Sequence, residues 1–175
     1  MPVIRFATIC YAAIGLLGSA AIADALAASA TPAGPAVIMH KDLSYTVAKT
    51  IAETVIAACA AKSYPVAAVV VDRDGETLIA MRGDEAVPLT MENARRKAYT
   101  AMTFKQTTAD YAKKLNDGNP VVRQQITLPG VIAIPGGVPI RSGDAVIGAV
   151  GASGSPGFDD DCVAAGLDAV KDQLQ

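Results

Sequence analysis

The chain has 175 residues and a formal net charge of −2, from 15 basic and 17 acidic side chains. This near-balance lacks the basic excess by which proteins neutralise nucleic-acid phosphates, so we expect no nucleic-acid partner. Only 5% of the residues are aromatic and none is tryptophan, so the core must be built from Ala, Val, Ile and Leu, which pack well in sheets covered by helices.

The first 30 residues have the composition of a secretion signal. One charge, Arg5, precedes an uncharged run over 6–23 that is too short and too rich in Ala and Gly for a membrane span. Small residues at the spacing that a signal peptidase reads place cleavage between residues 23 and 30; the alternative is an uncleaved membrane anchor. We therefore predict a periplasmic or secreted protein with no stable membrane span after cleavage, a linker over 31–41 and one domain over 42–175.

The first half of that domain has the pattern of a helix, a hairpin and two further helices. Apolar residues three or four apart predict a helix from Asp42 to near Ser63, which Pro65 ends. Apolar runs over 66–71 and 76–81, separated by Asp-Arg-Asp-Gly, predict a β-hairpin. The next helix has Thr90 as its expected N-cap and an alanine-rich buried stripe, and a shorter one covers 108–115, capped by Thr107 or Thr108.

The second half changes to short strands, at 131–134, 138–140 and 145–150, with a hairpin turn over 141–144. Glycines at 148, 151, 154 and 157 fit neither face of a strand, so we expect backbone, a ligand or a partner chain to come close there. A final helix is expected over 159–174. The predicted order is α-β-β-α-α-β-β-β-α.

Candidate polar groups lie after the first hairpin and at a pair of glycines. Three consecutive cations at 95–97 point about 100° apart on a helix, so either two are solvated and one pairs with Asp84 or Glu92, or one or two hold a ligand carboxylate. Gly136 and Gly137 either present amides to an anion or form a tight strand connection. A single histidine in the whole chain excludes a multi-histidine metal site. Cys59 and Cys162 either form a disulfide or remain two buried thiols.

Five segments carry a family resemblance, in the order VVDRDG, MRGD, ARRKAYTA, GGVPI and IGAVGASG, beginning at residues 70, 81, 94, 136 and 147. Together they resemble the GlcG and HbpS-like haem-binding (haem-degrading-domain) family over about residues 43–169. The resemblance implies an α/β (α+β), profilin-like fold with a central antiparallel sheet flanked by helices, and frequent homo-oligomerisation. It also implies binding of a tetrapyrrole, with some secreted members proposed to degrade haem or to take part in redox sensing.

The leading hypothesis is therefore an exported protein that binds haem or a related tetrapyrrole. The alternatives are an oxidative haem-degrading enzyme and a non-catalytic oligomeric accessory or redox-sensing partner protein. Propionates would meet Arg or Lys side chains, and the ring would lie on Met, Leu and Tyr. The expected cofactor-binding residues are Arg82, Asp84, Thr90, Arg96, Tyr99, Thr100, Gly136 and Gly137.

The resemblance bears on the iron ligand, the cysteines and the assembly. Relatives often carry a histidine where this chain has Leu89, which leaves His40 as the only imidazole to consider for a metal. In the implied fold the first and last helices can lie side by side on one face of the sheet, so we predict a disulfide between Cys59 and Cys162. We also predict a homo-oligomer, formed through the glycine-rich strand end and the alanine-rich helix.

Overall fold

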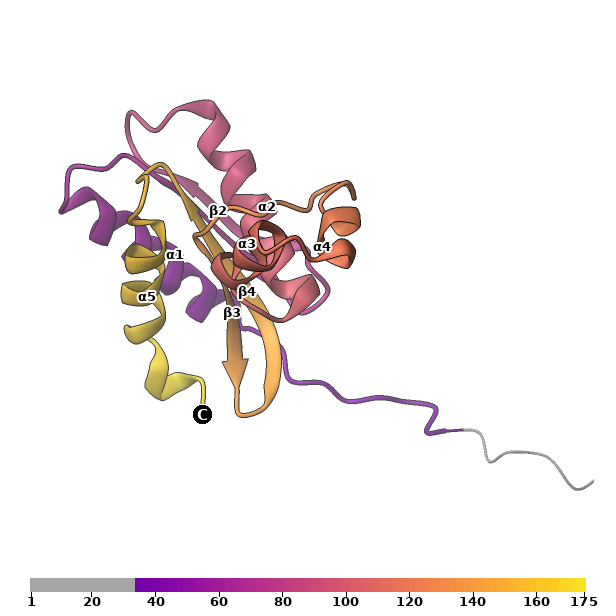
Figure 1. Ribbon diagram of the computed structural model, residues 1–175. Coiled ribbons are helices and arrows are strands. Elements are labelled where there is room, and N and C mark those ends of the chain that lie inside the picture. Colours follow the sequence, from indigo (N-terminus) through magenta and orange to yellow (C-terminus); the bar gives the residue numbers. More distant parts are fainter. Residues whose placement is uncertain (1–33) are drawn as a thin grey trace, which may run out of the picture. The chain divides into compact units, whose positions relative to one another are not determined.

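A four-stranded antiparallel sheet in the order β2-β1-β4-β3 lies between two layers of helices (Figure 1). The computed structural model describes residues 34–175, of which 40–175 form one compact unit. The predicted secretion signal lies outside the described residues. Within 34–175, no helix has both the length and the apolar composition needed to cross a membrane. The strands are β1 (Ala67–Asp72), β2 (Thr77–Arg82), β3 (Gly137–Ser142) and β4 (Ala145–Ser153).

The helices cover both faces of the sheet, which confirms the predicted fold class. On one face α1 (Tyr45–Ala60) and α5 (Asp159–Asp168) lie side by side, and on the other α2 (Pro88–Phe104) crosses β1 and β4 (Figure 1). Short helices α3 (Thr108–Asn116) and α4 (Pro120–Gln125) follow α2, and a single 3-10 turn, η1 (Lys171–Gln173), follows α5.

The central strand β1 supplies apolar side chains to both layers. Ala68 and Val70 join the core under α1 and α5, whereas Val69 and Val71 join the core under α2. Successive side chains of a strand point to opposite faces, so a strand that is buried on both faces reads as a continuous apolar run. This is why the run over 66–71 was recognisable as a strand from the sequence.

Close backbone contact explains the glycines of β4. A Cβ on Gly151 would overlap the carbonyl oxygen of Ala94 in α2, and one on Gly148 would lie 2.6 Å from the carbonyl oxygen of Val71. Ala94 and Ala98 are themselves fully buried against the sheet. The strand end and the alanine stripe are therefore occupied within the chain. The predicted homo-oligomer stays a prediction, but it would need a different surface.

Several predicted boundaries are wrong. The segment 131–134 is not a strand. Helix α4 was not predicted, because Asn119 and Pro120 were interpreted only as the end of α3. They also start α4, since the Asn119 side chain accepts hydrogen bonds from two backbone amides of that helix. Thr90 is not an N-cap, since α2 already begins at Pro88. The last helix ends at Asp168. The N-cap of α3 is Thr107, one of the two predicted candidates.

Replacing Gly151 with alanine should destabilise the fold, because the added methyl group overlaps the backbone of α2. We expect a loss of about 1 to 3 kcal/mol or more in the free energy of unfolding, the range for overpacked cores. Gly143→Asn is the control: Gly143 has φ +59° in the β3–β4 turn and open space around it, and asparagine tolerates that conformation. Equal urea midpoints for the two variants would contradict the close packing of α2 on β4.

Candidate functional site

Three predicted ligand residues of α2 hold the segment 130–132 in place. The Arg96 guanidinium donates to the carbonyl oxygen of Val131, and the Thr100 hydroxyl accepts from the amide of Ile132 at 2.9 Å. The ring of Tyr99 packs against Gly130: a Cβ added to Gly130 would lie 3.3 Å from the nearest ring atom. These contacts explain why 131–134 does not pair as a strand, since a backbone carbonyl and a backbone amide of this segment form hydrogen bonds with side chains of α2.

The remaining α2 cations have different partners. Arg95 forms an exposed ion pair with Glu92 at 2.8 Å, which lowers the pKa of the Glu92 carboxyl. The expected pairing of one cation with Glu92 is confirmed by Arg95. The expectation that the other two are solvated is wrong, because Lys97 is 1% exposed and Arg96 is partly buried and donates to Val131. Thr90 is also buried, and its hydroxyl donates to the carbonyl oxygen of Val87 at 2.7 Å. Its hydroxyl therefore closes the first turn of α2.

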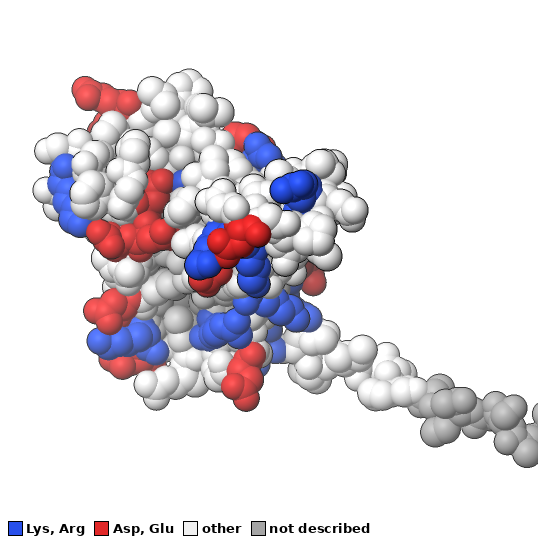
Figure 2. Space-filling model, viewed as in Figure 1, with Lys and Arg blue, Asp and Glu red and all other residues white. Residues whose placement is uncertain are grey.

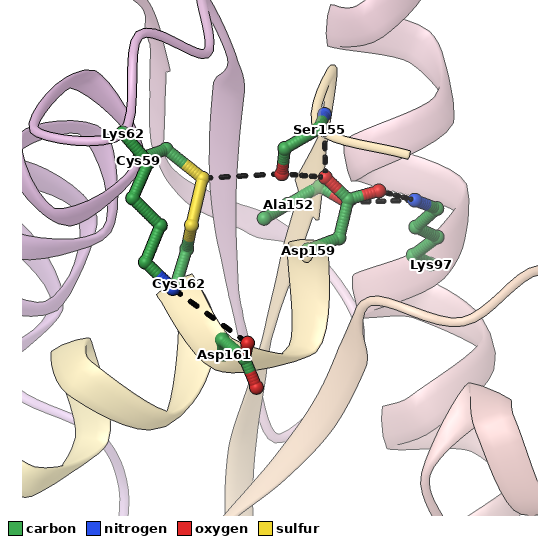
Figure 3. Close-up of a disulfide and its surroundings, with 8 residues drawn as sticks. All are labelled: Cys59, Lys62, Lys97, Ala152, Ser155, Asp159, Asp161 and Cys162. Carbon is green, nitrogen blue, oxygen red and sulfur yellow. Dashed lines mark hydrogen bonds and ion pairs between the residues drawn. A yellow bond between two sulfur atoms is a disulfide. The ribbon is translucent and has the colours of Figure 1, made fainter. Parts of the chain in front are cut away.

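The buried ammonium group of Lys97 reaches the end of the sheet (Figure 3). It donates to the carboxylate of Asp159 at 2.7 Å and to the carbonyl oxygen of Ala152 at 2.8 Å. Asp159 in turn accepts two hydrogen bonds from Ser155, from the amide at 3.0 Å and the hydroxyl at 2.7 Å. Since α2 and α5 lie on opposite faces of the sheet, this ion pair joins the two helical layers.

Gly136 makes room for this ion pair, and Gly137 makes room for the backbone of α2. Gly136 has φ +115°, and a Cβ there would lie 2.9 Å from the Lys97 nitrogen and 2.7 Å from the Asp159 Cβ. The amide of Gly137 donates to the Thr108 hydroxyl at 2.8 Å. Burial raises the pKa of the Asp160 carboxyl, and a hydrogen bond from the Gly136 amide opposes that shift. Both amides considered for a ligand anion thus have partners inside the chain.

The first turn of α5 is also tied to α1 (Figure 3). A disulfide joins Cys59 of α1 to Cys162 of α5, with Cα atoms 5.5 Å apart, as predicted from the resemblance. The Ser155 hydroxyl lies 3.2 Å from the Cys59 sulfur, and Lys62 lies 3.7 Å from the Asp161 carboxylate. The disulfide and the buried ion pair therefore meet at the first turn of α5. The sequence predicted the disulfide but not the burial of Lys97 or its pairing with Asp159.

Removing the ammonium of Lys97 should strongly destabilise the protein, because it leaves the carboxylate of Asp159, only 12% exposed, without a counter-charge. We expect Lys97→Met to cost about 3 to 5 kcal/mol in the free energy of unfolding, measured in urea under oxidising conditions. Adding Asp159→Asn should restore part of that loss.

Lys113→Met is the matched control for Lys97→Met. Lys113 pairs with Asp117 at 2.6 Å, but both side chains are exposed, so its removal should cost about 1 kcal/mol or less. Similar losses for Lys97→Met and Lys113→Met would show that the buried pair is no more important to stability than a surface pair.

Arg82 is the predicted site residue that borders an apolar groove. The groove has a volume of about 440 Å³ and is lined by Glu53, Ile56 and Ala57 of α1 and by Met81 and Arg82 of β2. Among residues 34–175, no carboxylate forms an ion pair with the Arg82 guanidinium. Its cation is therefore available to a ligand.

Asp84 and His40 do not share this groove. Asp84 lines a smaller recess of about 290 Å³ with Tyr64 and Glu85, although it is only two residues from Arg82. His40 is exposed at the start of the compact unit. In the described part of the chain, no cluster of three His, Cys, Asp or Glu side chains could hold a metal ion. The eight predicted residues are thus distributed over several places rather than gathered in one site.

On the face shown in Figure 2, charge does not single out a site. Figure 2 shows basic and acidic side chains near one another over the visible face. Exposed apolar side chains are more distinctive: in the loop before α2 and its first turn, Val87 is 60% exposed and Leu89 66% exposed. The groove differs from this loop in having apolar walls with an arginine, Arg82, in its lining.

Comparison with known proteins places this geometry in a family. The model for "Haem degrading protein HbpS-like" matches residues 43–168. A double mutant of Streptomyces reticuli HbpS is 28% identical, with a TM-score of 0.73, over 82% of this chain and 97% of that one. Protein GlcG of Escherichia coli is 31% identical over 91 residues, 52% of this chain and 66% of GlcG. The structure of a PduOC:haem complex shares the fold, with a TM-score of 0.69 and 24% identity over 74% of this chain and 95% of that one.

Proposed function

The chain belongs to the HbpS-like family of haem-degrading proteins, and we propose that it binds haem or a related tetrapyrrole in the groove between α1 and β2. The family description and the haem complex of PduOC support the ligand class. The observation that carries the place of binding is an apolar groove whose lining includes Arg82, an exposed arginine that forms no ion pair among residues 34–175.

The residues of the groove fit the chemistry of haem. Ile56, Ala57 and Met81 supply apolar surface, which a porphyrin ring needs because it is flat and apolar. Arg82 can hold a propionate through two parallel N–H···O bonds, the strongest form of such a contact. Glu53 lies in the same groove, but its charge is shared with Lys49, 3.2 Å away. The cation at the groove is thus not neutralised from within.

In this proposal the protein provides binding and orientation. Arg82 fixes the edge of the ring that carries the carboxylates, and the wall of α1 excludes water from one face. Haem, when bound, supplies the redox chemistry of its iron. The side chains of Arg96, Tyr99 and Thr100 act at a distance from the groove, since they hold the 130–132 segment against α2.

Changing Arg82 to alanine should weaken haemin binding without affecting stability. Loss of one charge-assisted hydrogen-bonding group corresponds to about 1 to 3 kcal/mol, or roughly 5- to 150-fold in the dissociation constant. A Soret titration of purified protein with haemin measures it. Arg123→Ala is the control, because Arg123 is an exposed arginine of α4 and does not line the groove.

Three outcomes of that titration have different meanings. Saturable binding that Arg82→Ala weakens and Arg123→Ala leaves unchanged supports the proposal. Equal affinity of all three proteins excludes the groove, and no saturable shift at all supports an accessory protein without a small ligand. Bleaching of the bound haem on adding reductant and oxygen would favour the haem-degrading enzyme.

We also propose that the protein is exported. The disulfide between Cys59 and Cys162 supports this, because disulfides persist in oxidising compartments and are rare in the cytosol. The composition of residues 1–30 supports it independently. A bridge that closes a loop of about 100 residues stabilises a domain by a few kcal/mol in the chain-entropy model, so export and stability are linked here.

Mass spectrometry of the protein isolated from an expressing bacterial culture tests export. We expect a mature N-terminus between Asp24 and Thr31, no alkylation of Cys59 or Cys162 after denaturation, and two alkylated cysteines after reduction of a monomeric chain. An intact Met1, or two cysteines that react without reduction, would contradict the proposal.

A further inference from the structure

We propose that the thioether of Met81 is the side-chain ligand of the haem iron in this groove. The proposal rests on the proposed haem binding and adds the ligand identity and the redox preference of the site. Met81 lines the groove from β2, next to Arg82, and its side chain is only partly buried. A thioether is one of the side-chain ligands that proteins offer to haem iron.

The other usual iron ligands lie elsewhere in the described part of the chain. The cysteines of 34–175 are joined in a disulfide and are 0% and 1% exposed, so they offer no thiolate. His40, the single histidine of the chain, does not line the groove. Met102 and Met91 belong to α2: Met102 is buried in the core under that helix, and Met91 packs against the same core, on the opposite face of the sheet from α1.

Glu53 is the competing ligand within the groove. Its carboxylate comes from α1, on the side of the groove facing Met81, and is half-exposed in its pair with Lys49. Oxygen and sulfur donors differ in a measurable way, because a hard carboxylate favours ferric iron whereas a soft thioether favours ferrous iron. The two ligands therefore predict opposite redox preferences.

Ligation by Met81 makes the site selective for reduced haem. Binding equilibria and reduction form a closed thermodynamic cycle, so tighter binding of ferrous than of ferric haem raises the midpoint potential of the bound haem. A tenfold change in that ratio corresponds to about 59 mV for a one-electron couple. Axial thioether ligation is known to act on haem potential in this direction.

The experiment compares the wild type with Met81→Leu, Glu53→Gln and His40→Ala. Leucine keeps the volume and apolar character of methionine, so the groove wall is preserved. For each protein we would measure the ferric affinity with haemin, the ferrous affinity after reduction with dithionite under anaerobic conditions, the visible spectrum and the midpoint potential.

We expect Met81→Leu to leave ferric affinity unchanged and to lose about tenfold in ferrous affinity, with a midpoint potential lower by about 59 mV and an altered ferrous spectrum. Glu53→Gln and His40→Ala should keep the wild-type spectra. If Met81→Leu has the spectra and potential of the wild type, the inference is wrong while haem binding stands. If the change appears in Glu53→Gln or His40→Ala instead, that residue is the ligand. If the wild type binds no haem, the proposed function fails, and this inference fails with it.

Discussion

The buried ion pair between Lys97 and Asp159 is the contact on which the arrangement of the two helical layers depends. A lysine ammonium is costly to remove from water, and here it is 1% exposed, so it is stable only because a carboxylate and a carbonyl oxygen receive its hydrogens. Gly136 leaves the space that the ammonium needs, because a Cβ there would lie 2.9 Å from its nitrogen. The pair connects α2 on one face of the sheet to α5 on the other.

The first turn of α5 extends this connection to α1. In this turn Asp159 pairs with Lys97 of α2. Asp161 pairs with Lys62, just after α1, and Cys162 forms the disulfide with Cys59 of α1. Breaking a buried pair costs several kcal/mol, a large fraction of the 5 to 15 kcal/mol by which domains are stable. The polar groups at this end of the sheet are thus committed to holding the layers together.

The groove between α1 and β2 lies apart from this network. It is at the β2 edge of the sheet, whereas Gly137 belongs to β3 at the opposite edge. In the proposed site a ligand would lie at β2, two strands away from β4, whose Ala152 carbonyl oxygen accepts a hydrogen bond from Lys97. One end of the sheet is thus held by the Lys97–Asp159 pair, whereas the β2 edge is open and apolar. The proposed haem site and its proposed sulfur ligand depend on this open edge.

Local signals in the sequence predicted the parts of the fold that local interactions determine. The Asp-Arg-Asp-Gly turn between two apolar runs gives the β1–β2 hairpin, and the Thr107 side chain starts α3. The strand prediction for 131–134 was wrong because Arg96 and Thr100 of α2 hold the backbone of this segment, a contact between residues more than 30 positions apart. In the run of three cations, only the packing of α2 decides that Lys97 faces inward, although its position three residues after the buried Ala94 was a usable signal.

The same limit applies to the site. Arg82 was a candidate from the polar cluster after the first hairpin and from the family resemblance, but Glu53 and Ile56 come to the same groove only when α1 packs beside β2. Hydrogen–deuterium exchange with and without haemin tests the placement of the ligand most directly, because it reports every backbone amide of the chain. The account predicts slower exchange on haemin addition in β2 and in α1 near residues 53–57, with the 134–137 and 155–160 segments unchanged. Protection of those two segments instead, with β2 and α1 unchanged, would contradict it.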